Sequence, residues 1–581
     1  MAVRRGVWIV LVLIILAVAI SAMGLVAMAL FVGRAPQVAS NSTLVLKISG
    51  DLEEQEPGGV LGQFLEAPPT VHTLVDALRK AKVDKRISSV IIRPTGAAAL
   101  WGKIQEVRDA ITDFRRSGKP IVGFLEYGGQ QEFYLATACD KVFLVPTSTL
   151  DLTGMANYEL FLRGTLDKIG AYPDTMHIGE FKTASNTFTE HTFTPAHREM
   201  AESLNSDLYE QLVRGIANGR RKSESDVRTL IDHGPFLPED AVRAGLVDDV
   251  AYEDEIDDKV SLSNGKVNFV TESDYRRVSP ASLGLNRGER IAVIFATGVI
   301  ATGESNSDSV SGRVVGADTM AESLRKARAD SSIKAIILRI DSPGGSAIAS
   351  DVIWREVMLT RNVKPLVASM SDVAASGGYY IAMPAHAIVA QPSTLTGSIG
   401  VVMLKFVIDG TLKKLGMNME GVAKGRYADL YSPVRAFTPE ERAKVQEQMQ
   451  ATYDTFVEKA AAGRNTTPER IDAIAQGRVW TGSQGKQIGL VDELGGLQRA
   501  LAVAKQRAKI APDAEVEIVV YPERKSFYDL VRNPFGASEQ ASALGALLGI
   551  RDPRALQSLT APLHVFRKGE PLAIMPNVFA R

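Results

Sequence analysis

The second half of this 581-residue chain repeats the first, and this duplication limits the possible folds more than any other feature. The segment Leu74–Arg93 aligns with Met320–Arg339 at a shift of 246 residues (339 − 93). Both segments have the pattern of an amphipathic helix, a polar turn and a β-branched strand. Helices that alternate with buried strands are typical of an α/β fold with a mostly parallel sheet. We therefore predict two tandem α/β domains.

The repeat and the hydropathy pattern together divide the chain into five parts. A segment rich in Gly, Pro and Ser at 279–290 links the two repeats. We predict a cytoplasmic N-terminus, a transmembrane anchor, a first repeat, a second repeat and a C-terminal extension, at residues 1–6, 7–32, 43–285, 286–510 and 511–581. The extension is too intermittently apolar for a second membrane span, so we expect it to pack against the body or a neighbouring subunit.

The apolar run at 7–32 is uncharged, about as long as a bilayer-spanning helix, and longer than the core of a usual signal peptide. Arg4 and Arg5 precede it, which favours a cytoplasmic start under the positive-inside rule. The rest of the chain then faces outward, which in a bacterium is the periplasmic side of the inner membrane. A signal peptide cleaved after the small residues at 27–29 is the alternative.

Charge and cysteine content exclude two classes of partner. With 66 basic and 67 acidic residues, the chain has no net basic field for nucleic acid. Its one cysteine, Cys139, forms no intrachain disulfide, and no Cys/His cluster with zinc spacing is present in the sequence. We therefore expect neither a nucleic-acid partner nor a bound metal.

The two halves differ at a glycine pair that follows a predicted strand. The second half reads DSPGGS with Gly344 and Gly345, where the first half reads PTGAAA. Adjacent glycines after a buried strand let the backbone approach a ligand closely and point N–H groups at it, as an oxyanion hole requires. A plain Pro-Gly-Gly turn is the alternative interpretation.

A second difference is Ser376, in the stretch AASGG, whose counterpart in the first half is Gln130. A serine at a strand-to-helix turn has an accessible hydroxyl and a backbone N–H beside it, which suits acyl chemistry. The alternative interpretation is that these small residues allow a helix to pack closely against its neighbours.

A base for that serine is not found among the seven histidines, because none lies in a recognisable Ser/His/Asp arrangement. A lysine is the other option, since burial can lower its usual pKa of about 10.4 towards neutrality. Lys182 lies thirteen residues before Pro195, and the same count before Pro439 reaches Arg426, which stays protonated and cannot be a base. Most lysines are solvated surface residues, so the count alone does not select Lys182.

The motifs DSPGG, AASGGYYIA and PSTLTGSIG in the second half and GEFKTA in the first resemble those of signal peptide peptidase A, also called protease IV, in its long duplicated form. The resemblance covers nearly the whole chain. It implies tandem Clp protease/crotonase-like domains behind one membrane anchor, a serine endopeptidase with a Ser/Lys dyad, and a homotetramer. It also implies that the substrates are hydrophobic signal peptides left over after secretion.

Carried onto this chain, the resemblance makes Ser376 the nucleophile and Lys182 the general base. Backbone N–H groups of Gly377 and of one member of the glycine pair would hold the oxyanion, and Ser398 would orient the lysine amine. The segment GEFK departs from the family's GKYK, although the lysine is kept. No metal or organic cofactor is implied.

Two other functions compete with a peptidase. A crotonase-like acyl-CoA enzyme also uses glycine-rich oxyanion turns, but it is expected in the cytosol without an anchor, and we find no CoA-binding surface in the sequence. A catalytically inactive membrane scaffold is the second, against which the retention of both Lys182 and Ser376 argues.

Overall fold

The computed structural model describes residues 38–55, 68–256, 268–308, 312–522 and 571–575, together with Leu16 and Lys259. The predicted N-terminus and anchor at 1–6 and 7–32 lie, apart from Leu16, outside the described residues. Within the described ranges, no helix is both long enough and apolar enough to cross a bilayer.

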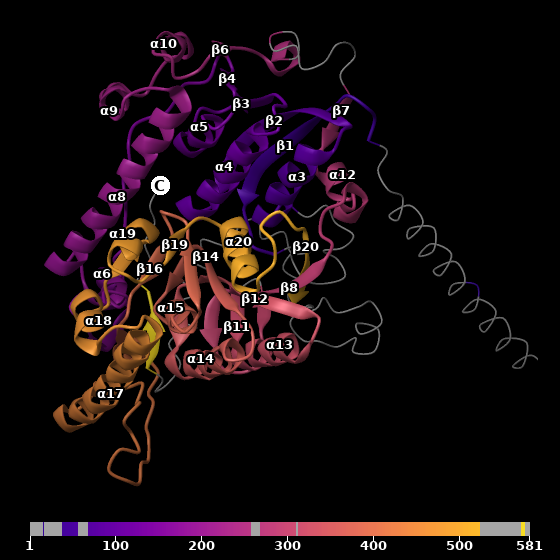
Figure 1. Ribbon diagram of the computed structural model, residues 1–581. Coiled ribbons are helices and arrows are strands. Elements are labelled where there is room, and N and C mark those ends of the chain that lie inside the picture. The colour runs from indigo at the N-terminus through magenta and orange to yellow at the C-terminus, as the bar shows by residue number, and fades with distance from the viewer. Residues whose placement is uncertain are drawn as a thin grey trace, which may run out of the picture.

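Six parallel strands occur in the same order in both halves; they form the whole sheet of the first half and part of an eight-stranded sheet in the second (Figure 1). The first has the order β6-β4-β3-β2-β1-β7, and the second has β19-β15-β14-β12-β8-β20. The strands of the first sheet are β1 (Ser42–Asp51), β2 (Ile87–Ala98), β3 (Ile121–Leu125), β4 (Lys141–Leu144), β6 (Asp249–Val250) and β7 (Asn268–Thr271). Those of the second are β8 (Glu289–Thr297), β12 (Ile333–Ser342), β14 (Leu366–Ala375), β15 (Ala387–Ala390), β19 (Glu493–Leu494) and β20 (Val516–Tyr521). The predicted tandem α/β duplication is confirmed.

The helices repeat with the sheets. The first three pairs are α3 (Val71–Val83) with α13 (Ala317–Ala329), α4 (Trp101–Arg115) with α14 (Ala347–Arg361), and α5 (Gln130–Ala136) with α15 (Gly377–Ala382). The long helices α8 (Pro195–Arg220) and α17 (Pro439–Gly463) form a fourth pair. Both begin with proline after a threonine, Thr194 or Thr438, whose side chain accepts a hydrogen bond from a backbone N–H of the first turn.

Shorter helices connect these elements. In the first half they are α6 (Arg163–Ile169), α7 (Asn186–Thr189), α9 (Glu224–His233), α10 (Pro238–Arg243), α12 (Glu272–Arg276) and the 3₁₀ turns Glu253–Glu255 and Pro280–Leu283. In the second half they are α16 (Asp409–Lys414), α18 (Pro468–Ile474), α19 (Gly482–Gln487) and α20 (Leu497–Arg507).

Strand β20 lies beyond residue 510, where the sequence comparison ends the second repeat. It pairs in parallel with β8, as β7 pairs with β1 in the first half. The sheet of the second half therefore extends past that boundary to Tyr521. The strand pairing persists where the two halves no longer match in sequence, because backbone groups rather than side chains form the hydrogen bonds between strands.

A third, mixed sheet joins the two halves in the order β10-β11-β9-β13-β21-β17-β5. Its strands are β5 (Tyr172–Ile178), β9 (Val299–Ala301), β10 (Asn306–Asp308), β11 (Gly312–Gly316), β13 (Gly344–Ser346), β17 (Val401–Val407) and β21 (Leu572–Ile574). Strands β16 (Leu395–Gly397) and β18 (Val479–Thr481) extend the sheet of the second half beyond β14. Because β5 belongs to the first half, this sheet brings the loop that follows β5 to the second half.

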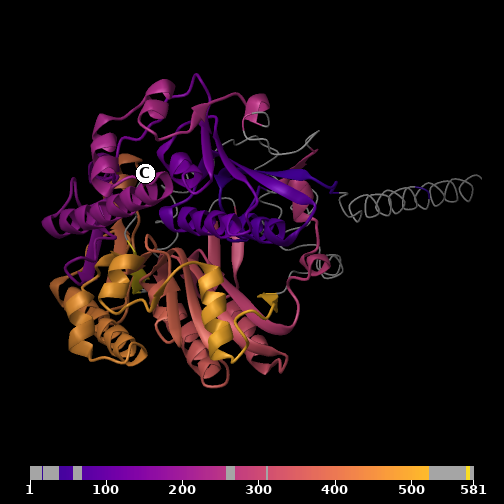
Figure 2. The same cartoon turned by 45° about the horizontal axis from the view of Figure 1, so that its top comes forward.

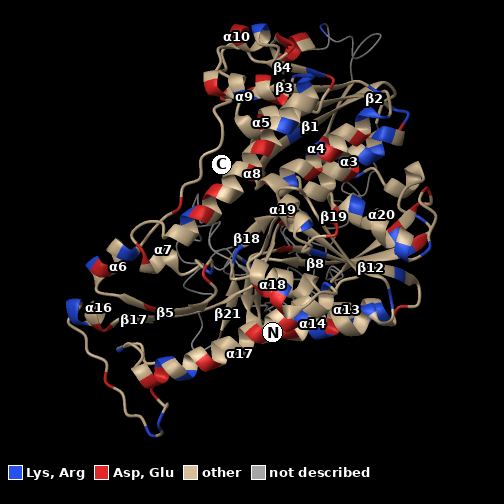
Figure 3. Ribbon diagram, turned by 60° about the vertical axis from the view of Figure 1, so that its left-hand side comes forward, with Lys and Arg blue, Asp and Glu red and all other residues tan. Residues whose placement is uncertain are grey.

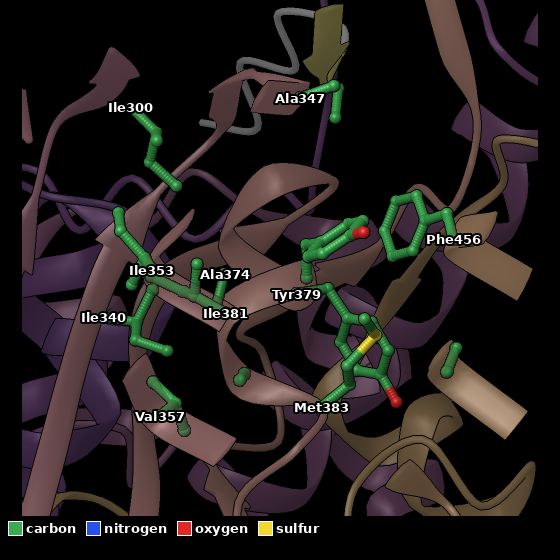
Figure 4. Close-up of a cluster of buried hydrophobic side chains, with 14 of the residues drawn as sticks. Ile300, Ile340, Ala347, Ile353, Val357, Ala374, Tyr379, Ile381, Met383 and Phe456 are labelled. Carbon is green, nitrogen blue, oxygen red and sulfur yellow. The ribbon is translucent and has the colours of Figure 1, made fainter. Parts of the chain in front are cut away.

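The largest hydrophobic core fills the second half (Figure 4). Ile340 comes from β12, Ile353 and Val357 from α14, Tyr379 from α15 and Phe456 from α17, and each is no more than 1% exposed. Burial of this kind stabilises by roughly 1.5–3 kcal/mol per large side chain. The core holds α15 firmly against β12 and β14, which fixes the turn that precedes this helix.

A buried ion network lies between the halves, which are stacked one above the other in Figure 2. The fully buried Arg339 of β12 donates to Glu54 (2.8 Å) and Glu106 (2.7 Å), both from the first half. Burial alone would raise the pKa of the Glu54 carboxyl, but Arg339 and His72 hold that pKa well below its usual value. On the outer helices, by contrast, acidic and basic residues are interspersed (Figure 3).

Candidate active site

Ser376 lies in the turn between β14 and α15, with a backbone conformation that few side chains adopt. Its φ is 55° and its ψ is −113°, and its N–H donates to the carbonyl of Gly397 at 2.7 Å. A non-glycine residue in a sparsely populated region costs of order 1–3 kcal/mol, and such strained turns hold reactive side chains in place. The predicted strand-to-helix position of the serine is therefore confirmed.

Lys182 reaches this serine from the other half of the same chain. It lies in the loop between β5 and α7, and its Nζ is 2.8 Å from Ser376 Oγ. The same Nζ lies 2.9 Å from the carbonyl oxygen and 3.0 Å from the hydroxyl oxygen of Ser398. The structure thus brings together three side chains that the sequence singled out, although the lysine and the nearer serine are 194 residues apart.

The amine of Lys182 is completely buried, and burial holds its pKa well below its usual value of 10.5. Its three close partners are two hydroxyls and a carbonyl, so none of them supplies a negative charge. An uncharged amine has two N–H donors and one lone pair. It can donate to both oxygens of Ser398 and accept the hydroxyl proton of Ser376, which uses all of its capacity.

Two glycines that sequence reasoning missed enclose the lysine. A Cβ placed on Gly477 would lie 2.5 Å from the backbone nitrogen of Lys182, and one on Gly400 would lie 3.0 Å from its Cδ. Gly477 also has a φ of +77°, which favours glycine. Gly400 ends the motif PSTLTGSIG, but Gly477 is a single glycine in the stretch AQGRVW and is indistinguishable from an ordinary turn glycine.

The predicted oxyanion glycines lie beside the serine turn. A Cβ on Gly344 would lie 2.7 Å from the backbone nitrogen of Gly377, and one on Gly377 would lie 3.1 Å from Gly344 Cα. A Cβ on Gly345 would instead be closest to Ile300, at 2.1 Å from its carbonyl oxygen. Gly377 is the first residue of α15, where N–H groups have no partner within the helix. Gly344 and Gly377 therefore bring two backbone segments close together beside Ser376, and the N–H of Gly344 donates to Ser342 Oγ at 3.2 Å.

A buried charged cluster joins the two strands that lead into the site. Asp341 accepts a hydrogen bond from the N–H of Val373 (3.2 Å) and lies 2.7 Å from Lys103 Nζ. Asp372 accepts from the N–H groups of Leu100 (3.0 Å) and Lys103 (2.7 Å) and so caps α4 of the other half. Burial raises the pKa of Asp372 to about 6. The first half is thereby fixed to the strands that carry Ser376 and Gly344.

The equivalent positions elsewhere in the duplication carry no second pair. Gln130, the counterpart of Ser376, accepts a hydrogen bond from the N–H of Gly154 at 3.0 Å. Arg426, the counterpart of Lys182, is exposed and forms an ion pair with Glu440. The serine is therefore present only in the second half, and the lysine only in the first.

Comparison with known proteins identifies the family of the chain. A model of peptidase family S49 matches residues 113–265 and again 359–511, which are related by the same shift of 246 (359 − 113). The chain is 36% identical over 490 residues to the chloroplastic serine protease SPPA of Arabidopsis thaliana, covering 83% of this chain and 72% of that protein. It is 33% identical over 559 residues to Protease 4 of Salmonella typhi, covering 91% and 87%. A putative signal peptide peptidase SppA of Enterococcus faecium is 32% identical over 265 residues, which are 45% of this chain and 76% of that protein.

A duplicated α/β fold of this kind, matched by these relatives along most of its length, defines a serine endopeptidase. The chain belongs to peptidase family S49. The family resemblance seen in the sequence motifs is therefore confirmed.

Proposed function

We propose that this peptidase works through a Ser/Lys dyad, with Ser376 as nucleophile and Lys182 as general base. The observation that carries the proposal is the 2.8 Å separation between Lys182 Nζ and Ser376 Oγ, at a site where burial lowers the pKa of the amine. A lysine is a useful base near neutral pH only when it is largely uncharged, and burial without a carboxylate partner has that effect.

In the first step, uncharged Lys182 takes the hydroxyl proton of Ser376 as the serine oxygen attacks the substrate's peptide carbonyl. Backbone N–H groups of Gly377 and of Gly344 or Gly345 stabilise the negative oxygen of the tetrahedral intermediate. Gly344 lies nearer to Gly377 than Gly345 does, and its N–H would exchange its present acceptor, Ser342 Oγ at 3.2 Å, for the oxyanion.

In the second half of the reaction, protonated Lys182 gives its proton to the leaving amine, and an acyl ester on Ser376 remains. Lys182 then takes a proton from the water that hydrolyses this ester. Ser398 accepts two N–H bonds from the amine throughout and so keeps its lone pair directed at the reacting oxygen. These steps use only side chains and backbone groups of the chain.

The proposed substrates are hydrophobic signal peptides that remain after secretion. The sequence motifs and the name of the Enterococcus faecium relative support this class. We further propose that residues 7–32 anchor the enzyme in the inner membrane of a bacterium as a single pass, with the catalytic body in the periplasm, and that it assembles as a homotetramer. The uncharged run preceded by two arginines supports the anchor and its orientation, and the family resemblance supports the tetramer.

The test is hydrolysis of a hydrophobic signal-peptide-like substrate by the wild type, Ser376→Ala and Lys182→Ala, with folding and assembly checked for each. Both variants are expected to lose activity by at least about 10³-fold. Arg426→Ala, at the exposed counterpart of the lysine, is the matched control and should keep activity. Full activity in Lys182→Ala would show that another group is the base.

A further inference from the structure

Strand β21, from the C-terminal segment 571–575, is inserted between two strands of the second half (yellow in Figure 1). It pairs antiparallel with β13, which holds Gly344 and Gly345, and also antiparallel with β17. The N–H of Met575 donates to the carbonyl of Pro343 (2.8 Å), and the N–H of Ala347 donates to that of Pro571 (3.2 Å). The segment is therefore bound by backbone hydrogen bonds at both ends.

Without this segment, β13 and β17 would face each other across a gap as two strand edges. Each edge would present backbone N–H and C=O groups without a partner, and an extended peptide satisfies such groups by adding a strand. The sheet order shows that β21 occupies the one position between them. A bound strand at this place lies where an extended substrate would pair beside the oxyanion glycines.

The segment also approaches the reacting groups. A Cβ on Gly344 would lie 1.9 Å from the carbonyl oxygen of Ala573, and one on Gly377 would lie 3.2 Å from the same oxygen. The Ala573 carbonyl thus reaches the junction of the two glycine backbones.

The side chain of Met575 fills a small apolar cluster beside the serine turn, and it is only 7% exposed. The other buried members of the cluster are Met200, Leu204, Ala375, Leu395 and Val479. They come from both halves and include the residue just before Ser376. Since residues 571–575 read PLAIM, the strand is uncharged as well as extended.

We propose that a peptide substrate binds between β13 and β17, a position that we call the peptide-binding groove, that residues 571–575 are an intramolecular ligand of this groove, and that the substrate displaces them. The inference rests on the proposed peptidase function. It assigns an apolar side chain of the substrate to the cluster that Met575 fills. The segment then acts as a competitor tethered to the enzyme, which reduces the fraction of molecules with an open groove.

Such competition has a definite kinetic signature. When only a fraction of the molecules is open, the apparent KM is the intrinsic KM divided by that fraction, whereas kcat is unchanged once substrate has displaced the segment. Weakening the docked strand should therefore lower KM without altering kcat.

Two full-length variants weaken the strand by different means. Met575→Asp places a charge in the apolar cluster, and Ala573→Pro removes a backbone donor from the middle of β21. Each is expected to lower KM for an uncharged apolar peptide by about three-fold or more, with kcat within about two-fold of the wild type. Met419→Asp makes the same substitution at an exposed methionine and should leave both constants unchanged.

A binding measurement separates this inference from the proposed function. In a Ser376→Ala background, a labelled PLAIM peptide should bind more tightly when Met575→Asp is added. Equal affinity, unchanged KM in both variants, or no binding by either protein would overturn the inference. If the wild type and all variants fail to hydrolyse peptides while the binding difference persists, the proposed peptidase function fails and the intramolecular ligand remains.

Discussion

Replacing the buried lysine with methionine should remove activity, and the stability of the variant relative to the wild type should rise as the pH falls from 10.5 to 8. In the unfolded chain Lys182 has its usual pKa of 10.5, whereas burial lowers the pKa in the fold. The unfolded state therefore binds more protons below pH 10.5, so this residue makes stability fall as the pH falls. Each pH unit between the lowered pKa in the fold and 10.5 costs the folded state about 1.36 kcal/mol.

Lys182→Met removes that cost but also the three hydrogen bonds of the amine, one with Ser376 and two with Ser398, which are worth about 1 kcal/mol each. The variant should accordingly be less stable than the wild type by about 3 kcal/mol near pH 10.5, and this deficit should shrink by about 1.36 kcal/mol for each unit by which the pH falls towards 8. Other groups that titrate in this range are common to both proteins and cancel in the difference.

The assay is urea unfolding of the two proteins at several pH values between 8 and 10.5. Lys80→Met is the matched control, because Lys80 is also buried but lies 3.2 Å from Asp76 and donates to three backbone carbonyls. Its loss should destabilise the protein at pH 8. A stability difference between wild type and Lys182→Met that does not change with pH would refute the reasoning, since it would mean that the lysine stays protonated in the fold.

Three further substitutions test the surroundings of the dyad. Ser398→Ala removes one acceptor of the Lys182 amine, so steady-state kinetics should show kcat reduced about five-fold with KM unchanged. An unchanged kcat would exclude an orienting role for Ser398. Gly344→Ala adds a Cβ 2.7 Å from the backbone nitrogen of Gly377, at a φ of +102°, so kcat should fall about 10²-fold or more. A kcat equal to that of the wild type would place the oxyanion elsewhere. Lys103→Met leaves two buried carboxylates without their cation and should cost about 3–5 kcal/mol in urea unfolding at neutral pH. That loss should shrink as the pH falls towards 6 and below, where carboxyls such as Asp372 take up protons, and a loss independent of pH would show that the lysine acts by packing alone.

The parts of the fold that could be predicted are those that the duplication repeats. The helix and strand read from Leu74–Arg93 correspond to α3 and β2, and the aligned segment in the second half corresponds to α13 and β12. The same comparison marked Ser376, whose counterpart Gln130 cannot be a nucleophile, whereas Lys182 was selected only by the resemblance of the motif GEFKTA. The period of an amphipathic helix and the apolar run of a buried strand are local signals, so the sequence carries them directly.

The parts that could not be predicted depend on contacts between distant segments. The mixed sheet pairs β5 of the first half with β17 of the second, and β21 joins it from the far end of the chain. Neither pairing leaves a periodic pattern in the sequence. The role of Gly477 is hidden for the same reason, because what excludes a side chain there is the backbone of Lys182 in the other half.

Because Lys182 and Ser376 come from different halves, the proposed Ser/Lys mechanism makes proteolysis depend on complete synthesis and folding. Under that mechanism, a partly synthesised chain that ends before residue 376 has its lysine but lacks the proposed nucleophile, and a detached second half lacks the proposed base. Neither piece is expected to cut a neighbouring chain through this dyad while it is being made. The enzyme is therefore expected to stay inactive as a peptidase until both of its halves have folded together.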